Sequence, residues 1–186
     1  MKFDIILADP PWRFEAWDED TGNGRSAESH YSTMSVEDIC ALQIPAAHHS
    51  ILFIWAVWPM LPDALTVIES WGFEYKTIGW TWVKANPLGM GFFTGMGYYT
   101  RANTEPCLLA TRGKTLPVAR HDIQALIYSP VRNHSQKPDE QYPKIEKLYP
   151  GRNYLEMFAR QKGRPGWSYW GNEIESDIEI GMEIKG

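Results

Sequence analysis

Cysteine is scarce in this sequence, long apolar runs are absent, and basic side chains are fewer than acidic ones. The two cysteines, Cys40 and Cys107, have neither metal-site nor redox-pair spacing, so we expect buried thiols in a reducing compartment. The five histidines show no metal-ligand spacing either, and we expect no metal ion. No run reaches the ~18 apolar residues of a transmembrane helix, and the first ten residues do not resemble a signal peptide. These absences predict a cytoplasmic protein without a membrane partner.

The net charge of −5 argues against a stand-alone nucleic-acid binder, although a local basic patch can lie on an acidic protein. Aromatic residues are abundant, with nine Trp and nine Tyr. Such rings either fill the core or stack on a planar ligand, and composition leaves both interpretations open. A length of 186 residues predicts one domain, residues 1–174, followed by an acidic tail, residues 175–186, that we expect to fray.

Apolar runs and helical repeats alternate along the chain. We expect strands at 3–8, 50–57, 78–83, 106–111, 125–129, 153–158 and 167–170. Helices are expected from Ser35, which begins an S-x-x-D start signal, from Pro59 to Gly72, and from Pro138 to Gly151. This alternation predicts an α/β fold with a mostly parallel sheet, whose ligands bind beyond the carboxyl ends of the strands. Residues 9–12 and 156–160 both lie at such ends, so we expect them to share one crevice.

Two long loops, residues 13–33 and 85–103, are candidates for closing over a substrate. The second loop contains GMGFFTG, which looks superficially like a nucleotide-binding loop. A dinucleotide-binding loop needs a strand just before it and a helix opening within it, and neither flank is present. We therefore interpret this stretch as a mobile loop with aromatic side chains for stacking or packing.

The tetrapeptide Asp9-Pro10-Pro11-Trp12 directly follows the first predicted strand. An ionised Asp9 only accepts hydrogen bonds, and Pro10 adds a carbonyl at fixed geometry, so together they suit an –NH₂ group. Pro11 stiffens the turn and Trp12 offers a flat face for stacking. Two acceptors on an aromatic amine would favour a pyramidal nitrogen whose lone pair points at an electrophile. The alternative is an ordinary proline turn at a strand end.

DPPW resembles the catalytic motif of amino-methyltransferases that use S-adenosylmethionine. The likeness extends to seven further stretches of the chain. They are HYSTMSVEDI at 30–39, LFIWAV at 52–57, ESWGFE at 69–74, WVKAN at 82–86, EPCLLATRGK at 105–114, QKPDEQYPKIEKLYPG at 136–151 and LEMFAR with GNE at 155–173. Their order is similar to that in the catalytic subunit of the eukaryotic mRNA adenosine-N6 methyltransferase and its bacterial and phage relatives. The resemblance spans about residues 3–173. It implies a Rossmann-like methyltransferase fold with permuted motif order, in which the catalytic DPPW loop precedes the cofactor strand.

The resemblance also implies roles for individual residues. Asp9, Pro10, Pro11 and Trp12 would be catalytic, and Asp9 would also face the S-adenosylmethionine cofactor. Lys137 would face the methionine carboxylate of the cofactor, and Phe158, Arg160, Asn172 and Glu173 would surround its ribose and adenine. Five further residues resemble substrate-binding or loop-anchoring positions of the family: Tyr31, Lys84, Asn86, Arg101 and Glu105. From the residues alone, Lys137 could equally be a solvated lysine, Arg160 a partner of a surface acid, Phe158 a packing residue and Glu156 a structural acid.

Three positions depart from the family pattern. Ala159 stands where the family often has Gly, Glu173 where it often has Gln, and Lys162 at the position of a family histidine. A Glu can accept from ribose hydroxyls but cannot donate to them. The eukaryotic enzymes also contact the cofactor adenine with a segment before the first strand, so that half of the adenine pocket has no named residue here.

The leading hypothesis is an adenine N6-methyltransferase that acts on a base taken out of its stack. The small size, without an obvious target-recognition domain, favours DNA as the nucleic acid, and RNA is the alternative. A homodimer and a heteromeric assembly both stay open. Two further classes compete: a non-catalytic subunit of a heteromeric methyltransferase, which the intact DPPW and Lys137 argue against, and a small-molecule amine methyltransferase, which the acidic charge favours.

Overall fold

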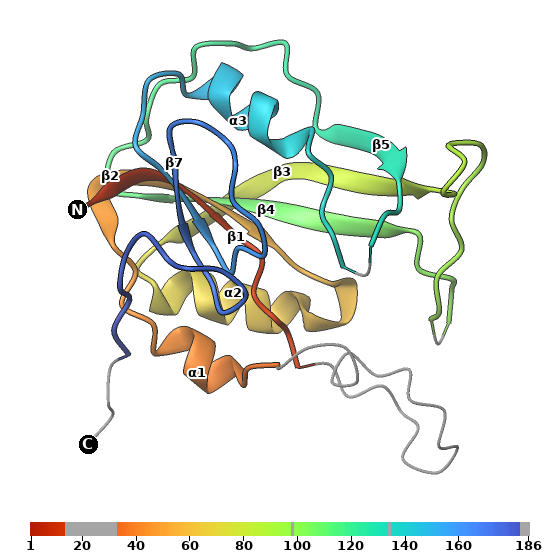
Figure 1. Cartoon of the computed structure of the whole chain (residues 1–186), viewed down its shortest axis with the longest axis horizontal. Helices are drawn as coiled ribbons and strands as arrows, with labels where there is room; N and C mark the ends of the chain where they lie inside the picture. Colours follow the sequence, from red (N-terminus) through yellow and green to blue (C-terminus); the bar gives the residue numbers. More distant parts are fainter. Residues whose placement is uncertain (14–32, 98, 134, 183–186) are drawn as a thin grey trace.

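In the computed structural model, the chain folds into a twisted sheet with helices on both faces (Figure 1). The structure describes residues 1–13, 33–97, 99–133 and 135–182. Its helices are α1 (Val36–Cys40), α2 (Leu61–Ser70), which follows a 3₁₀ turn at Trp58–Met60, and α3 (Gln141–Leu148). Its strands are β1 (Phe3–Ala8), β2 (Ala46–Trp55), β3 (Glu74–Ala85), β4 (Thr104–Arg112), β5 (Leu126–Pro130), β6 (Tyr154–Met157) and β7 (Trp167–Trp170).

The described strands form one seven-stranded sheet in the order β5-β3-β4-β2-β1-β6-β7. Strand β1 lies between β2 and β6 and is parallel to both. Only β4 among these strands runs against its neighbours, β2 and β3. The predicted α/β fold with a mostly parallel sheet is therefore confirmed. Because β1, β2, β3 and β6 all point the same way, their carboxyl ends meet at one edge of the sheet.

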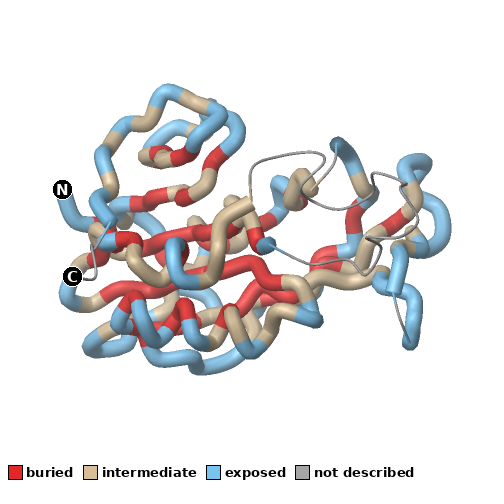
Figure 2. The backbone as a smooth tube through the Cα atoms, turned by 90° about the horizontal axis from the view of Figure 1, so that it is seen from below, coloured by how far each residue is buried: buried red, intermediate tan, exposed pale blue. Residues whose placement is uncertain are grey.

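Both faces of the central strands are buried, which explains why β1 and β2 have no polar alternation. Ile6 and Ala8 face the core cluster that includes Ile39 of α1 and Val67 of α2. The alternate residues of β1 face a second cluster, which includes Ile145 of α3. Figure 2 shows this buried centre running through the sheet, with exposed backbone around it.

Most of the tryptophans belong to this core. Trp12, Trp55, Trp71, Trp80, Trp82 and Trp167 are buried, and the Phe53 and Trp80 rings stack with centroids 4.8 Å apart. Of the two interpretations of the aromatic residues, core packing accounts for these six side chains. Cys107 is buried as expected and burial raises its pKa, whereas Cys40 is half-buried.

The predicted elements are confirmed, with two corrections. Helix α3 begins at Gln141 rather than Pro138, because Pro138 lies in a tight turn whose carbonyl accepts from the Gln141 N–H at 3.3 Å. The described part of the acidic tail, residues 175–182, is held by hydrogen bonds, contrary to the expectation that it frays. The Asp177 carboxylate accepts hydrogen bonds from Lys162 at 2.6 Å and from the Tyr169 backbone N–H at 2.8 Å. The tail then reaches the segment that follows α1, where the Gln43 N–H donates to the Gly181 carbonyl at 2.8 Å.

Two negative findings apply to the described residues alone. No helix among them is long and apolar enough to cross a membrane. They also contain no group of three His, Cys, Asp or Glu side chains that could hold a metal ion.

Ser35 caps α1 as its S-x-x-D motif predicts, because its hydroxyl accepts from the Asp38 N–H at 3.0 Å. Ser35→Ala should lower the free energy of unfolding by about 1 kcal/mol, since that N–H loses its acceptor. Urea denaturation would measure the loss. Ser35→Asp restores an acceptor and should stay close to the wild type, and equal losses in the two variants would contradict the capping role.

Candidate active site

A cleft opens at the edge where the carboxyl ends of β1 and β6 meet. It is lined by Leu7, Asp9, Trp55, Ser135, Gln136, Lys137, Asp139, Gln141, Tyr142, Glu156, Phe158, Arg160 and Gln161. The expectation that residues 9–12 and 156–160 share a crevice is confirmed through Asp9, Glu156, Phe158 and Arg160. The cleft also draws on Trp55 of β2 and on the segment that leads into α3, so four stretches of the chain build it.

Four charged side chains form a continuous series beside this cleft. The ammonium of Lys137 lies 2.9 and 3.0 Å from the two carboxylate oxygens of Asp9. On its other side it lies 3.5 Å from Oε2 of Glu105, whose Oε1 is paired with Lys84. Lys137 also lies 5.7 Å from the Trp55 ring centroid, over its face. One lysine therefore bridges two carboxylates that come from β1 and β4.

Burial and charge act in opposite directions on these carboxyl groups. Burial raises the pKa of Asp9, and Lys137 opposes that rise. Burial alone would also raise the pKa of Glu105, but the ammonium groups of Lys137 and Lys84 together lower it below its ordinary value. Glu105 is thus held as a carboxylate between two lysines, while the pKa of Asp9 depends on Lys137.

The DPPW loop is fixed by its own backbone and by β2. The Trp12 N–H donates to the Pro10 carbonyl at 2.8 Å, and the Met34 N–H donates to the Pro11 carbonyl at 3.0 Å. The Pro10 carbonyl, which we expected to be free, is therefore already bonded once and keeps its second lone pair. Trp12 is only 6% exposed, and its indole N–H donates to the Trp55 carbonyl at 3.0 Å. Trp12 anchors the loop, and stacking on a base remains a prediction for it.

Glu156 at the end of β6 lies in the cleft beside Tyr142 of α3. The Tyr142 hydroxyl lies 3.0 and 3.1 Å from the two carboxylate oxygens and donates to Glu156. Burial raises the pKa of Glu156 to about 7, despite this hydrogen bond, which favours the charged form. Glu156 can therefore gain or lose a proton near neutral pH.

The residues that follow β6 form the far side of the cleft. Phe158 has a φ of +61°, which is unusual for a residue other than Gly, and its ring meets Trp170 edge-on at 5.2 Å. Arg160 forms an ion pair with Glu173, with Nε 2.8 Å from Oε1. Glu173 therefore contacts a residue that lines the cleft. Asn172 is exposed and does not line the cleft. Gly171 lies so close to Ala159 that a Cβ would fall 2.1 Å from the Ala159 carbonyl oxygen.

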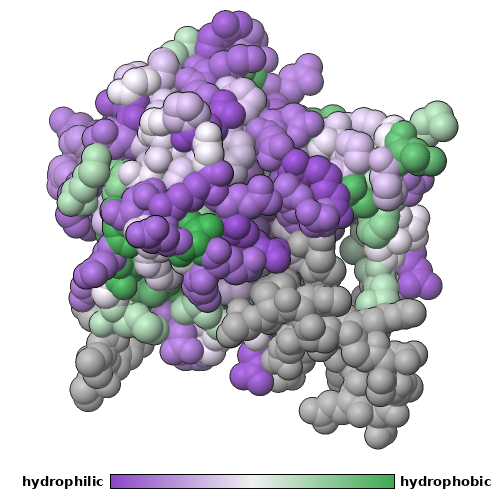
Figure 3. Space-filling view, in the orientation of Figure 1, coloured by the Kyte–Doolittle hydropathy of each residue, from purple (hydrophilic) through white to green (hydrophobic). Residues whose placement is uncertain are grey.

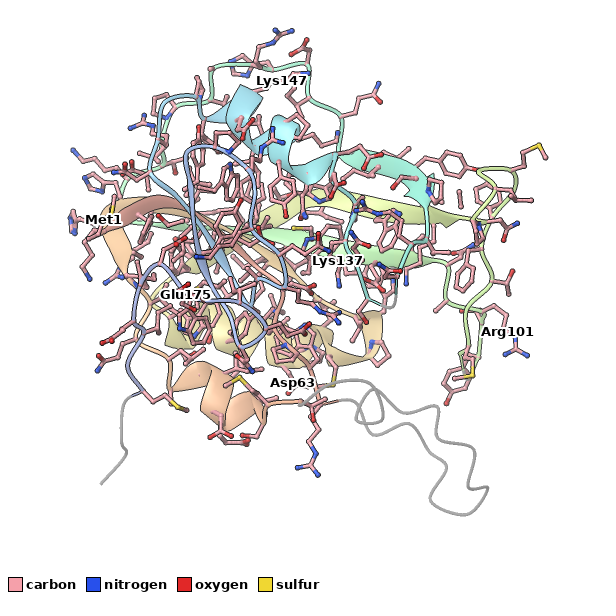
Figure 4. All side chains as sticks on the ribbon, viewed as in Figure 1. Met1, Asp63, Arg101, Lys137, Lys147 and Glu175 are labelled. Atoms are coloured by element: carbon pink, nitrogen blue, oxygen red, sulfur yellow. The ribbon has the colours of Figure 1, made fainter. Side chains whose placement is uncertain are left out.

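The residues predicted on the substrate side lie in different parts of the structure. Lys84 and Glu105 join the charged series, while the Asn86 amide donates to the Met90 carbonyl at 3.0 Å within its own loop. Arg101 is exposed and lies at the periphery, away from Lys137 (Figure 4). Tyr31 falls outside the described residues.

Sequence reasoning missed several lining residues, among them Trp55, Gln141 and Tyr142. Trp55 donates its indole N–H to Gln141 Oε1 at 2.8 Å, a contact between segments 86 residues apart. Local patterns carry no signal for such a pair. The sequence does contain a signal for Glu156, because an acidic residue within the apolar run of β6 is unusual.

A family model described as MT-A70 matches residues 3–173. The chain belongs to the MT-A70 family. A type II methyltransferase, M.MunI, from a Mycoplasma species is 32% identical over 96% of this chain and 81% of its own length. The N(6)-adenosine-methyltransferase MT-A70-like protein of Drosophila melanogaster is 31% identical over 98% of this chain, and the human N(6)-adenosine-methyltransferase catalytic subunit METTL3 is 29% identical over 94%.

The relatives differ in length from this MT-A70 chain. It spans 29% of the Drosophila relative and 28% of the human one, against 81% of the Mycoplasma enzyme. The predicted resemblance to the adenosine-N6 methyltransferases is therefore confirmed at the level of the family and of its methyltransferase fold.

The raised pKa of Glu156 generates a prediction about stability. Between pH ~4.5 and 7 the folded protein retains a proton that the unfolded chain releases, so stability falls as pH rises through this window. Glu156→Gln lacks this titration. From pH 4 to 8, its free energy of unfolding relative to the wild type should rise by on the order of 3 kcal/mol. Urea denaturation at several pH values measures this difference, and a pH-independent difference would contradict it.

Proposed function

We propose that this MT-A70 protein transfers a methyl group from S-adenosylmethionine to the N6 amine of adenine in DNA. The observation that carries the proposal is the position of Asp9. Its carboxylate lies at the end of β1, lines the cleft and is bound by Lys137. A group at that point can face a cofactor in the cleft and an amine that enters from the sheet edge.

The cleft residues fit the chemistry of S-adenosylmethionine. The cofactor supplies, when bound, a methyl group on a positively charged sulfur. Lys137 and Arg160 offer positive charge for its carboxylate, and Asp9 and Glu156 offer acceptors for its ammonium group. Phe158 provides an apolar surface. Glu173, which pairs with Arg160, and its sequence neighbour Asn172 are proposed for the ribose and adenine from positions outside the lining of the cleft. The cleft therefore pairs both signs of charge with a ring face.

Asp9 and the remaining lone pair of the Pro10 carbonyl would accept the two hydrogens of the adenine amine. A carboxylate also stabilises the positive charge that develops on the nitrogen as it attacks. Lys137 holds Asp9 in place for this task, because both carboxylate oxygens lie within 3.0 Å of its ammonium. Pro10 and Pro11 keep the loop rigid, so little reorganisation is needed during the reaction.

DNA is proposed over RNA because the chain covers most of the length of a relative named as a type II methyltransferase. The RNA alternative rests on relatives named as adenosine methyltransferases, of which this chain spans less than a third. A cytoplasmic location accompanies the proposal. Assembly as a homodimer or with a second subunit is compatible with it.

Asp9→Asn tests the proposed chemistry. The amide keeps the shape of the carboxylate but loses its charge, so turnover should fall by about 100-fold or more. Cofactor binding should weaken far less, because Glu156 offers a second acceptor for the cofactor ammonium. Radiolabelled methyl transfer and calorimetry would measure the two effects. Asp4→Asn is the matched control, because Asp4 is on the same strand but at its other end, where it accepts from the Asn153 N–H at 3.2 Å. Full turnover by Asp9→Asn would remove its proposed role.

The product identifies the substrate. Incubation with labelled S-adenosylmethionine and either DNA or RNA, followed by mass spectrometry of the nucleosides, should yield N6-methyladenine from DNA. The same product from RNA alone would replace DNA by RNA in the proposal. Methylated small amines without a methylated base would favour the small-molecule alternative. Absence of cofactor binding at millimolar concentration would favour a non-catalytic subunit.

A further inference from the structure

Gln141, the first residue of α3, is a polar side chain that has no part in the proposed methyl transfer. Three of the described residues that line the cleft are buried, Leu7, Trp55 and Gln141, and only Gln141 among them ends in an amide. It is 3% exposed. Burying an amide costs folding free energy unless its hydrogen-bonding groups find partners. The partners of Gln141 therefore indicate which ligand this position serves.

One end of the Gln141 amide is fixed by Trp55 of β2. The indole N–H of Trp55 donates to Gln141 Oε1 at 2.8 Å. Because an indole nitrogen can only donate, the amide has to turn its oxygen toward the ring. The two N–H bonds of Nε2 then lie on the opposite side of the amide, and none of the described residues accepts from them. Gln141 is therefore an oriented donor at the wall of the cleft.

The same indole ring lies beside the positive charge of the cleft. The Lys137 ammonium is 5.7 Å from the Trp55 ring centroid, over the ring face, while Gln141 meets the N–H edge. Helix α3 begins at Gln141, so the positive end of its dipole lies at the same place. Figures 3 and 4 share one orientation, and hydrophilic residues surround the labelled Lys137. An anion is the acceptor that this combination of donors favours.

Two acids that line the same cleft have partners of their own. Asp139 accepts two hydrogen bonds from Arg132, at 2.6 and 2.9 Å, so its charge is balanced. Glu156 accepts from the hydroxyl of Tyr142, which directly follows Gln141 in α3. A donor amide and a carboxylate thus reach the cleft from adjacent positions of one helix. An α-amino acid, which has a carboxylate and an ammonium on the same carbon atom, matches this pair of groups.

We propose that the Gln141 amide donates a hydrogen bond to the carboxylate of S-adenosylmethionine, to which Lys137 supplies the positive charge. The inference rests on the proposed function and adds a residue that selects the amino-acid half of the cofactor. A lysine ammonium is a flexible point charge, whereas an amide held by Trp55 donates in one direction. Gln141 therefore favours the cofactor over adenosine derivatives that lack a carboxylate.

Two substitutions remove the donor in different ways. Gln141→Glu keeps an oxygen for the Trp55 indole, and Gln141→Met keeps a side chain of similar length without charge. In calorimetry, the Kd for S-adenosylmethionine should rise by about 10- to 100-fold in both variants, because a hydrogen bond to a charged group is lost. Methylthioadenosine, which has the same adenosine half but no carboxylate, should bind to both variants as it binds to the wild type. Mildly alkaline pH keeps the introduced carboxyl group ionised.

Gln124→Met is the matched control, since this exposed glutamine precedes β5 and does not line the cleft. It should bind both ligands like the wild type. Unchanged S-adenosylmethionine affinity in both Gln141 variants, or an equal loss for methylthioadenosine, would overturn the inference alone. A loss confined to Gln141→Met would also overturn it, because Gln141 would then only support the Trp55 indole. A wild type that binds neither ligand would overturn the proposed cofactor and this inference with it.

Discussion

The ammonium of Lys137, which lies between the carboxylates of Asp9 and Glu105, is the contact on which the candidate site depends. It joins the end of β1 to a segment 128 residues later and to the start of β4. Two half-buried carboxylates without this cation would repel each other and be poorly solvated. The ion pair therefore fixes the relative positions of three chain segments that share no local sequence signal.

Sheet order decides which predicted residues meet. Glu105 comes close to Lys137 because β4 is inserted between β2 and β3 and runs against them. Its first residues therefore lie at the edge of the sheet where the carboxyl ends of the parallel strands meet. Hydrophobic periodicity gives the extent of a strand but not its neighbours. The sequence consequently predicted the strands, the cap at Ser35 and the shared crevice of residues 9–12 and 156–160. It could not predict the link from Glu105 to Lys137.

Some contacts in the structure have no signal in the local sequence pattern. Pro138 is typical of a first helical position, yet here it closes a tight turn before α3. The acidic tail lacks a local reason to be ordered, and its order comes from Lys162 and the backbone of Tyr169. The hydrogen bond from the Trp12 indole to the Trp55 carbonyl likewise has no signal in the sequence around Trp12. The tail and Trp12 are thus held by residues outside their own segments, whereas the turn at Pro138 is local.

At Phe158, the left-handed backbone favours glycine for stability, whereas the cleft needs the phenyl ring. A residue other than Gly at φ +61° costs on the order of 1 kcal/mol of folding free energy. A glycine there would relax the backbone but would remove the ring that lines the cleft and packs on Trp170. Selection for thermal stability and selection for ligand binding would therefore favour different residues at this position, and a more heat-resistant variant obtained there should be a poorer binder.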